Sequence, residues 1–321
     1  MKDPLLRVEN LQTSFELHAG TLNAVDGVSF QANKGEIIGL IGESGSGKSV
    51  TALSIMRLVP LPGKILGGHV YFEGIDLLRN SDDQMRKIRG SKIAMSFQDP
   101  MTYLNPVMTV GDQIAESIII NQGLDKTKAR QRAIEVMETV KIPMSSERVN
   151  DYPHQFSGGM RQRVLLAIAI SCHPKLLIAD EPTTALDIIT QAEIIALLKE
   201  LNTHQGITTL IISHNLGVIA KLAHTVVIMY LGMIMEIGTV EDVFKRSRHP
   251  YTKGLLETVP RLGLETLPTI KGEIPNPINR PSGCPFNPRC PYAQGKCQAT
   301  KPPMLEIEKS HYVACFFPIM T

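Results

Sequence analysis

The fold is decided by Gly42-Glu43-Ser44-Gly45-Ser46-Gly47-Lys48-Ser49, which matches G-x-x-x-x-G-K-[ST] at every fixed position. The apolar run 36–41 precedes this loop and predicts a buried parallel strand, and residues 49–58 predict a helix. Glycines between a strand and a helix let backbone N–H groups converge on phosphate oxygens, and the helix N-terminus adds positive potential. The stretch therefore predicts a nucleotide-binding phosphate loop. Its expected ATP contacts are Gly42, Ser44, Gly45, Ser46, Gly47, Lys48, Ser49 and Val50, with Lys48 on the β- and γ-phosphates and Ser49 on Mg²⁺.

The chain around this loop alternates predicted strands with predicted helices. Buried strands are expected at 176–179, 207–212 and 226–230, and shorter strands at 5–8, 28–31, 70–72 and 92–97. Helices are expected within 111–140 and at 162–171 and 188–201. This alternation indicates an α/β fold with a mostly parallel sheet, and the helical block at about 99–175 reads as an inserted subdomain.

Composition restricts the classes of partner. The 321 residues are 43% hydrophobic and 20% charged, which suits a folded chain of about two domains. Lys and Arg number 33 against 31 Asp and Glu, so the net charge of +2 does not favour nucleic acid as a partner. The first residues lack the apolar stretch of a signal peptide, and no apolar run approaches the ~18–20 residues of a membrane span. We therefore expect a cytoplasmic protein that reaches a membrane only through a partner.

Two carboxylates, Asp180 and Glu181, follow the predicted strand 176–179. The carboxyl ends of parallel strands lie at the edge of the sheet where ligands bind, so we expect this pair beside the phosphate loop. Asp180 is placed to hold Mg²⁺, directly or through water. Glu181 points elsewhere and suits polarising the water that attacks the nucleotide.

A second glycine-containing helix start lies at Ser157-Gly158-Gly159-Met160. A second anion-binding helix N-terminus in a chain with one phosphate loop needs a use of its own. Together with Phe156, this segment resembles the L-S-G-G-Q signature of the ATP-binding-cassette (ABC) ATPases. Phe replaces Leu and Met replaces Gln, but the serine and both glycines, which carry the phosphate-facing backbone, are intact.

The resemblance implies an architecture and further site residues. The fold would be a P-loop NTPase cassette, with a RecA-like core, an antiparallel β subdomain and an inserted helical subdomain. In this family two cassettes face head to tail, and each ATP is held by the phosphate loop of one and by Ser157, Gly158 and Gly159 of the other. Thr184–Asp187 resembles the loop that crosses this dimer interface. The implied roles are Gln98 as the sensor of Mg²⁺ and of the membrane partner, His214 as the γ-phosphate switch, and Phe15 as the aromatic ring on adenine; Lys48, Gln98, Glu181 and His214 are then the catalytic set.

Longer motifs narrow the resemblance within that family. The segments 97–106 (FQDPMTYLNP) and 152–155 (YPHQ) resemble the ATPases of dipeptide, oligopeptide and nickel importers. His249–Thr252, with Leu255, Leu256 and Pro260, resembles the C-terminal motif of the same group, although proline and aromatic residues there predict a poorly helical surface element. The implied partners are a second ATPase subunit, two transmembrane permeases and, indirectly, an extracytoplasmic peptide-binding protein. The implied location is the cytoplasmic face of the cell membrane.

The last 60 or so residues differ from the rest, because 11 of the 21 prolines and four of the five cysteines lie there. Cys284, Cys290, Cys297 and Cys315 lack the C-x₂₋₄-C pairs that are usual for structural zinc, and disulfides are disfavoured in a reducing cytoplasm. Cys284 and Cys290 each precede a proline, as in bacterial ferredoxin motifs. A [4Fe–4S] cluster is the leading interpretation, and zinc or no metal are the alternatives. Similar importer subunits carry such a cluster, and the tail resembles that of their D-type subunit.

The sequence therefore predicts an ABC cassette at 1–240 and a Cys- and Pro-rich extension at 241–321. The predicted function is ATP binding and hydrolysis that energises import of dipeptides or oligopeptides, with ATP, Mg²⁺ and the cluster as cofactors. The alternatives are the ATPase of a nickel or other small-solute importer, a soluble ABC ATPase of translation or DNA repair, and an iron–sulfur redox enzyme. The soluble ATPases usually carry two cassettes or a long coiled coil, which this chain lacks, and nothing else in the chain would bind a redox partner.

Overall fold

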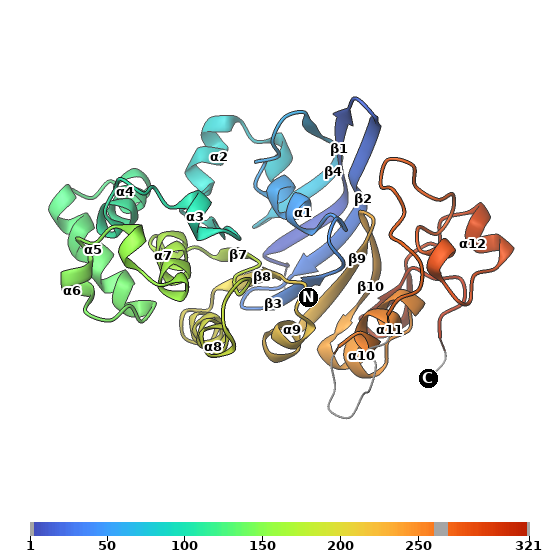
Figure 1. Ribbon diagram of the computed structural model, residues 1–321. Coiled ribbons are helices and arrows are strands. Elements are labelled where there is room, and N and C mark those ends of the chain that lie inside the picture. The colour runs from blue at the N-terminus through green and yellow to red at the C-terminus, as the bar shows by residue number, and fades with distance from the viewer. Residues whose placement is uncertain (1–2, 260–268, 320–321) are drawn as a thin grey trace. The chain divides into compact units, whose positions relative to one another are not determined.

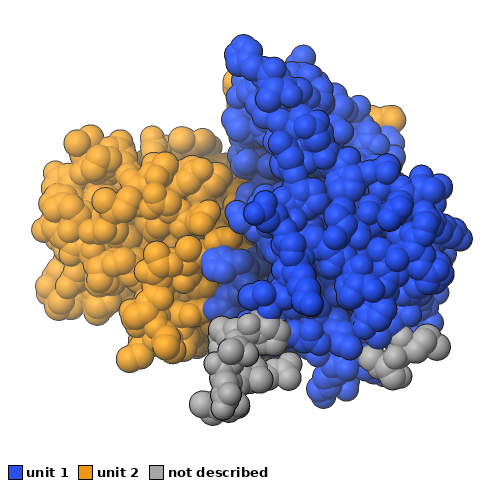
Figure 2. Space-filling model, turned by 45° about the vertical axis from the view of Figure 1, so that its right-hand side comes forward, with its two compact units in different colours: residues 1–32, 38–78, 213–321 blue, residues 33–37, 79–212 orange. Residues whose placement is uncertain are grey.

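The computed structural model describes residues 3–259 and 269–319, which form parts of two compact units (Figures 1 and 2). Unit 1 comprises residues 1–32, 38–78 and 213–321, and unit 2 comprises residues 33–37 and 79–212. The phosphate loop and the described part of the C-terminal tail both belong to unit 1. Pro260, one of the C-terminal motif residues, lies outside the described residues. The division at residue 240 stays a prediction.

Unit 1 contains a four-stranded antiparallel sheet with the order β2-β1-β4-β5. Its strands are β1 (Leu6–Leu17), β2 (Gly20–Ala32), β4 (Gly63–Phe72) and β5 (Ile75–Asp76). The β1–β2 hairpin is much longer than the predicted strands at 5–8 and 28–31. Register shifts between Val8 and Leu11 and between Thr13 and Ser14 break the alternation of buried and exposed residues. The period-two pattern in the sequence therefore stops well before the strand does.

The second sheet of unit 1 has the strand order β11-β12-β10-β9-β3. The buried strands β3 (Ile37–Ile41) and β9 (Thr225–Tyr230) are parallel, as predicted, and β10 (Met233–Thr239) returns antiparallel to β9. The turn at Leu231 and Gly232 divides the apolar stretch 225–235 into two strands. The helices of this unit's core are α1 (Lys48–Ile55), α9 (Leu216–Leu222) and α10 (Val240–Lys245), and η1 (Leu77–Arg79) lies at its boundary with unit 2.

The C-terminal tail is more regular than predicted. Pro250 occupies the first turn of α11 (Pro250–Glu257), where its missing N–H costs nothing, and His249 caps the helix by accepting the N–H of Tyr251. Tyr251 is fully buried, so the expectation of a poorly helical surface element was wrong. Further on, β12 (His311–Val313) pairs with β10 and with β11 (Leu305–Glu308), and the shorter elements are η3 (Asn287–Arg289) and α12 (Gly295–Ala299). Strand pairing thus ties the tail to the sheet that carries the phosphate loop.

Unit 2 contains three parallel strands in the order β8-β7-β6, and five helices lie between β6 and β7 in the sequence. The strands are β6 (Ile93–Ser96), β7 (Leu176–Asp180) and β8 (Thr208–Ile212), and β7 and β8 are buried throughout. The intervening helices are α3 (Pro100–Tyr103), α4 (Val110–Gln122), α5 (Lys126–Thr139), α6 (Ser145–Arg148) and α7 (Gly158–Ile170), with η2 (Pro153–Gln155) before α7. The unit also holds α2 (Asp82–Ile88) and α8 (Ile188–Gln205).

Helix boundaries in unit 2 follow from local capping. The hydroxyl of Thr109 accepts the N–H of Asp112 at the start of α4, and Gly123 ends that helix with a φ of 66°. Asp187 caps α8, and Gly206 ends it, also with a φ of 66°. None of the helices among the described residues has the length and apolarity that a membrane crossing requires.

Candidate functional site

The phosphate loop in unit 1 has the strand–loop–helix context that its sequence predicts. The loop follows β3 directly, and Gly47 caps α1 with a φ of 98°. A Cβ atom on Gly47 would lie 2.2 Å from the carbonyl oxygen of Ala24, so only glycine fits there. The adjoining turn supports the loop from outside, since the N–H of Gly232 donates to the carbonyl of Ser46 at 2.9 Å. The backbone of the loop is therefore fixed by the sheet around it.

Lys48 lies inside this loop, with 6% of the residue exposed. Its Nζ donates to the carbonyl oxygens of Gly42 at 2.8 Å and Glu43 at 3.0 Å, and to Oγ of Ser46 at 3.3 Å. An ammonium held among carbonyl oxygens is placed to exchange some of them for phosphate oxygens. Ser44 and Gly45 are exposed at the tip of the loop, and Ser49 and Val50 lie in the first turn of α1.

Unit 2 brings Gln98 and Thr184 together around the carboxylate of Glu181. Asp180 ends β7 and is 6% exposed, and Glu181 follows it. Oε2 of Glu181 accepts a hydrogen bond from Nε2 of Gln98 at 3.2 Å and from Oγ1 of Thr184 at 2.7 Å. The backbone of Glu181 has a φ of 47°, a left-handed conformation that residues other than glycine rarely adopt. Such strain costs about 1–3 kcal/mol and is concentrated at functional sites.

The signature segment starts α7, a mostly buried helix of unit 2. Ser157 caps α7, and its Oγ accepts the N–H of Met160 at 3.3 Å. Ser157 and Gly158 are exposed, whereas Gly159 is buried, and a Cβ there would lie 2.2 Å from Cγ2 of Thr190. Phe156, which stands where the family's signature has Leu, is 2% exposed and fills a core position. The helix start therefore presents the backbone of Ser157 and Gly158 at the surface of unit 2.

The loop resembling the family's dimer-crossing segment ends at Asp187, the cap of α8. Its carboxylate accepts the N–H groups of Ile189 and Thr190, both at 3.0 Å, and Oγ1 of Thr190 at 2.6 Å. Hydrogen bonds from the Thr190 side chain and backbone lower the pKa of the Asp187 carboxyl. The loop is thus anchored at its end by a fixed negative charge.

His214 and Phe15 lie in unit 1. His214 is exposed and directly precedes Asn215, the cap of α9. Phe15 lies on β1 opposite Leu22 of β2 and Gly63 of β4. A Cβ on Gly63 would lie 2.5 Å from Cε1 of Phe15, so the ring packs over the backbone of β4 and is half-buried. The roles of both residues stay predictions.

The four tail cysteines line one pocket of unit 1, together with His249, Phe286, Tyr292 and Phe316 among others. Cys284, Cys297 and Cys315 are buried, and Cys290 is half-buried. Burial is the largest cause that raises the pKa of Cys284 and of Cys315, each to about 11. No disulfide joins any of the five cysteines, all of which are described. The fold therefore gathers at one pocket four thiols from the segment 284–315.

Sequence reasoning missed a buried contact between the tail and the phosphate loop. Arg289 of η3 pairs with the Glu43 carboxylate, Nη1 to Oε2 at 2.8 Å and Nη2 to Oε1 at 3.2 Å. Oη of Tyr251 accepts the N–H of Glu43 at 3.0 Å. No local pattern announces this contact, because Arg289 and Tyr251 are more than 200 residues from Glu43.

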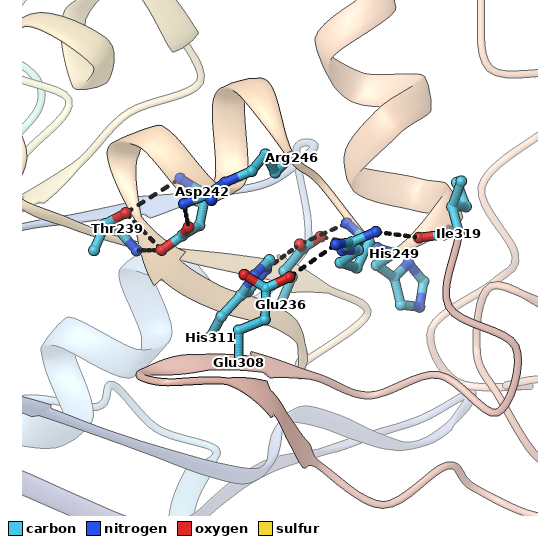
Figure 3. Close-up of polar contacts among 9 residues, drawn as sticks. Glu236, Thr239, Asp242, Arg246, His249, Glu308, His311 and Ile319 are labelled. Atoms are coloured by element: carbon cyan, nitrogen blue, oxygen red, sulfur yellow. Dashed lines mark hydrogen bonds and ion pairs between the residues drawn. The ribbon is translucent and has the colours of Figure 1, made fainter. Parts of the chain in front are cut away.

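A second missed cluster surrounds Glu236 of β10 (Figure 3). Its fully buried carboxylate accepts the N–H of Arg248 at 2.8 Å and of His249 at 3.0 Å, and Nε2 of His311 lies 2.7 Å from Oε1. Asp242, Glu308 and His311 have metal-binding atoms within 4.8 Å of one another. However, the two carboxylates already pair with Arg246 and Arg248, so we assign this group a structural role.

Comparisons with known proteins give the same family. Residues 25–184 match the family described as ABC transporter, and residues 235–297 match the oligopeptide/dipeptide transporter C-terminal region. The oligopeptide transport ATP-binding protein AppD of Bacillus subtilis (strain 168) is 47% identical over 97% of this chain and 96% of its own length. The dipeptide transport ATP-binding protein DppD of Escherichia coli (strain K12) is 45% identical over 98% of this chain and 97% of its own.

Solved structures agree with the predicted fold. A dimeric ATP-binding cassette in a post-hydrolysis state with ADP and Pi has a TM-score of 0.66 and 29% identity, and the match covers 73% of this chain and 98% of that one. The predicted P-loop NTPase cassette fold is therefore confirmed. The chain belongs to the ABC transporter family, among the ATP-binding proteins that carry the oligopeptide/dipeptide transporter C-terminal region.

Proposed function

We propose that this chain binds and hydrolyses ATP to energise the import of dipeptides or oligopeptides. The observation that carries the proposal is its 45–47% identity, over nearly the whole chain, to ATP-binding proteins named for dipeptide and oligopeptide transport. The phosphate loop and the glutamate that follows β7 supply the chemistry of an ATPase. Peptide specificity would come from the partner subunits, because nothing in the described site discriminates a transported solute.

The proposed catalytic roles follow from the environment of each side chain. Lys48 exchanges loop carbonyl oxygens for β- and γ-phosphate oxygens, because its Nζ already lies inside the loop, where it donates to the carbonyls of Gly42 and Glu43. Glu181 orients and polarises the attacking water, and the hydrogen bonds from Gln98 and Thr184 keep its carboxylate in place. His214 stabilises the γ-phosphate from an exposed position, and the Phe15 ring stacks on adenine. Gly42, Ser44, Gly45, Ser46, Gly47 and Val50 complete the nucleotide contacts.

Mg²⁺ is the proposed metal of this reaction, and its donors fit its preference for oxygen. The Ser49 hydroxyl, the Asp180 carboxylate and the Gln98 side-chain oxygen are hard oxygen donors. Bound there, Mg²⁺ would neutralise charge on the phosphates. Ser49 belongs to α1, Asp180 is the last residue of β7, and Gln98 lies in the segment after β6.

The exposed start of α7 supports a head-to-tail dimer. Its N-terminus presents Ser157 and Gly158 at the surface, where a helix start favours negative charge. We infer that these groups bind the nucleotide held by a second ATPase subunit, and that ATP stabilises the closed pair. Two permeases in the membrane and an extracytoplasmic peptide-binding protein would complete the importer, with this chain on the cytoplasmic face.

We propose that the four tail cysteines hold a [4Fe–4S] cluster. They line one pocket, and four thiolates are the ligand set of such a cubane. Their sequence spacing lacks the C-x₂₋₄-C pairs that are usual for structural zinc. The thiols would deprotonate on binding, and the positive charge of the iron would offset the burial that raises the pKa of Cys284 and Cys315. Bound there, the cluster would cross-link the tail.

Reconstitution tests the function directly. The chain would be co-expressed with the permeases and the second ATPase that are encoded by neighbouring genes. The purified complex would then be placed in vesicles with the binding protein and a radiolabelled di- or tetrapeptide. ATP-dependent peptide uptake that is lost in a Glu181→Gln variant is expected. Uptake of ⁶³Ni²⁺ but not of peptide would identify a nickel importer instead. Full ATPase activity without any permease would favour a soluble ATPase.

A further inference from the structure

The phosphate loop contains a carboxylate, which is an unfavourable group to place beside the phosphates of ATP. Glu43 is the second residue of the loop, between Gly42 and Ser44. Its backbone carbonyl accepts Nζ of Lys48 at 3.0 Å and the N–H of Ser46 at 3.1 Å, so Glu43 belongs to the framework that holds the catalytic lysine. A negative charge there would repel the nucleotide unless another group cancels it.

Arg289 cancels that charge with an unusually complete set of contacts. Its side chain is 5% exposed and that of Glu43 is 22% exposed. Beyond the bidentate pair with Glu43, Nη1 donates to Oη of Tyr230 at 3.3 Å. Nε donates to the carbonyl of Lys271 at 3.3 Å, and Nη2 donates to that of Ile270 at 3.4 Å. All five N–H donors of the guanidinium are therefore used, which a lysine could not reproduce.

Two aromatic rings flank this guanidinium. Its carbon lies 5.8 Å from the ring centre of Tyr230 and 6.0 Å from that of Phe286. A guanidinium is protonated throughout the pH range in which proteins fold. The contacts with Glu43 and Tyr230 therefore hold a fixed positive charge beside the phosphate loop.

We propose that Arg289 is a positioning residue for ATP, which neutralises and fixes Glu43 so that the phosphate loop accepts the nucleotide's phosphates. The inference rests on the proposed ATPase function and adds a residue from the C-terminal tail to it. Arg289 immediately precedes Cys290, so the pair with Glu43 lies one residue along the chain from the cysteine pocket.

A double-variant comparison on the full-length chain, purified without oxygen, tests the inference. The dissociation constant of the non-hydrolysable analogue AMP-PNP with Mg²⁺ is measured by calorimetry for each variant. Arg289→Gln leaves Glu43 unpaired and should raise that constant about tenfold, with a smaller rise at high salt. Glu43→Gln removes the negative charge and leaves that of Arg289 uncancelled beside the loop, so it should lower that constant, and the double variant should return to within about threefold of wild type. Lys301→Gln removes the same charge from the tail, at its contact with Asp26, and should leave binding unchanged.

The outcomes separate charge from packing. If the pair were merely structural, Glu43→Gln would weaken binding as much as Arg289→Gln does, and the double variant would not recover it. That result would overturn the inference. Unchanged binding in Arg289→Gln would overturn it as well. If Arg289→Gln alone does not fold, Glu43→Gln and the double variant still decide, because neither leaves an unpaired carboxylate in the loop, and weaker binding in Glu43→Gln would overturn the inference. Failure of the wild-type chain to bind the analogue would instead overturn the proposed ATPase function, and this inference with it.

Discussion

The Nε2 amide of Gln98 lies 3.2 Å from Oε2 of Glu181 and donates a hydrogen bond to it. The two residues follow neighbouring parallel strands, β6 and β7, whose carboxyl ends lie at the same edge of the sheet. Thr184 holds the same oxygen from the other side of the turn, and the backbone of Glu181 is strained. The position of the carboxylate is therefore set by unit 2 itself, before any nucleotide binds.

Replacing the charge of this carboxylate should separate binding from hydrolysis. A Glu181→Gln variant keeps the shape of the side chain but loses its basicity, so kcat should fall by about 10²- to 10⁴-fold while AMP-PNP binding stays the same. Phosphate release and calorimetry measure the two quantities. Thr184→Val, which removes one hydrogen bond and keeps the carboxylate, should cost less. If Glu181→Gln retains wild-type turnover, another residue polarises the water.

Lys48 should affect binding itself. Lys48→Ala removes the ammonium that we expect on the β- and γ-phosphates, and a hydrogen bond to a charged group is worth about 1.5–3 kcal/mol, so affinity for ATP should fall by about 10- to 100-fold. Calorimetry with Mg²⁺ and AMP-PNP measures the loss. Lys34→Ala changes the same charge at an exposed position outside the loop and serves as the matched control. Equal loss in both variants would contradict the assignment.

The nucleotide motifs were predictable from the sequence because each is short and local. The loop, its strand and its helix are contiguous, and so are the end of β7 and Glu181. The contacts of the tail were not predictable, since they join residues such as Glu43 and Arg289 that are far apart in the chain. The prediction of a poorly helical surface element at 249–252 was wrong for a related reason. A proline at the first helical position is compatible with a helix start, and only tertiary packing shows that Tyr251 is buried.

The buried His249 predicts how stability depends on pH. Burial is the main cause that lowers its pKa to about 4, against a nearby Glu236 carboxylate that raises it. In the unfolded chain this histidine has a pKa near 6.5. Between about pH 6.5 and pH 4 the unfolded chain therefore binds a proton that the folded chain does not bind. The free energy of unfolding falls as the pH is lowered through this window. The gap of about 2.5 pH units corresponds to about 3 kcal/mol at most.

A comparison of thermal unfolding at pH 7.5 and pH 5 measures this contribution. Asparagine is a good helix cap that does not titrate, so His249→Asn should keep α11 and lose less stability than wild type between the two pH values. The other titratable groups are the same in both proteins. The difference between their losses of stability therefore measures the contribution of His249. An identical loss in both would contradict a neutral, buried His249.

The cysteine pocket supplies the last prediction, which links the tail to nucleotide binding. Protein purified without oxygen should be brown, with about four iron and four sulfide per chain. Cys290→Ser should lose this colour, whereas Cys172→Ser should keep it, because Cys172 lies in unit 2 and not in the pocket. Since Arg289 precedes Cys290 and pairs with Glu43, release of this segment should also weaken AMP-PNP binding, and Glu43→Gln should restore it in the Cys290→Ser background. Colourless protein with one zinc would refute the cluster, and undiminished nucleotide affinity in a bleached Cys290→Ser variant would show that the pair with Glu43 survives without it.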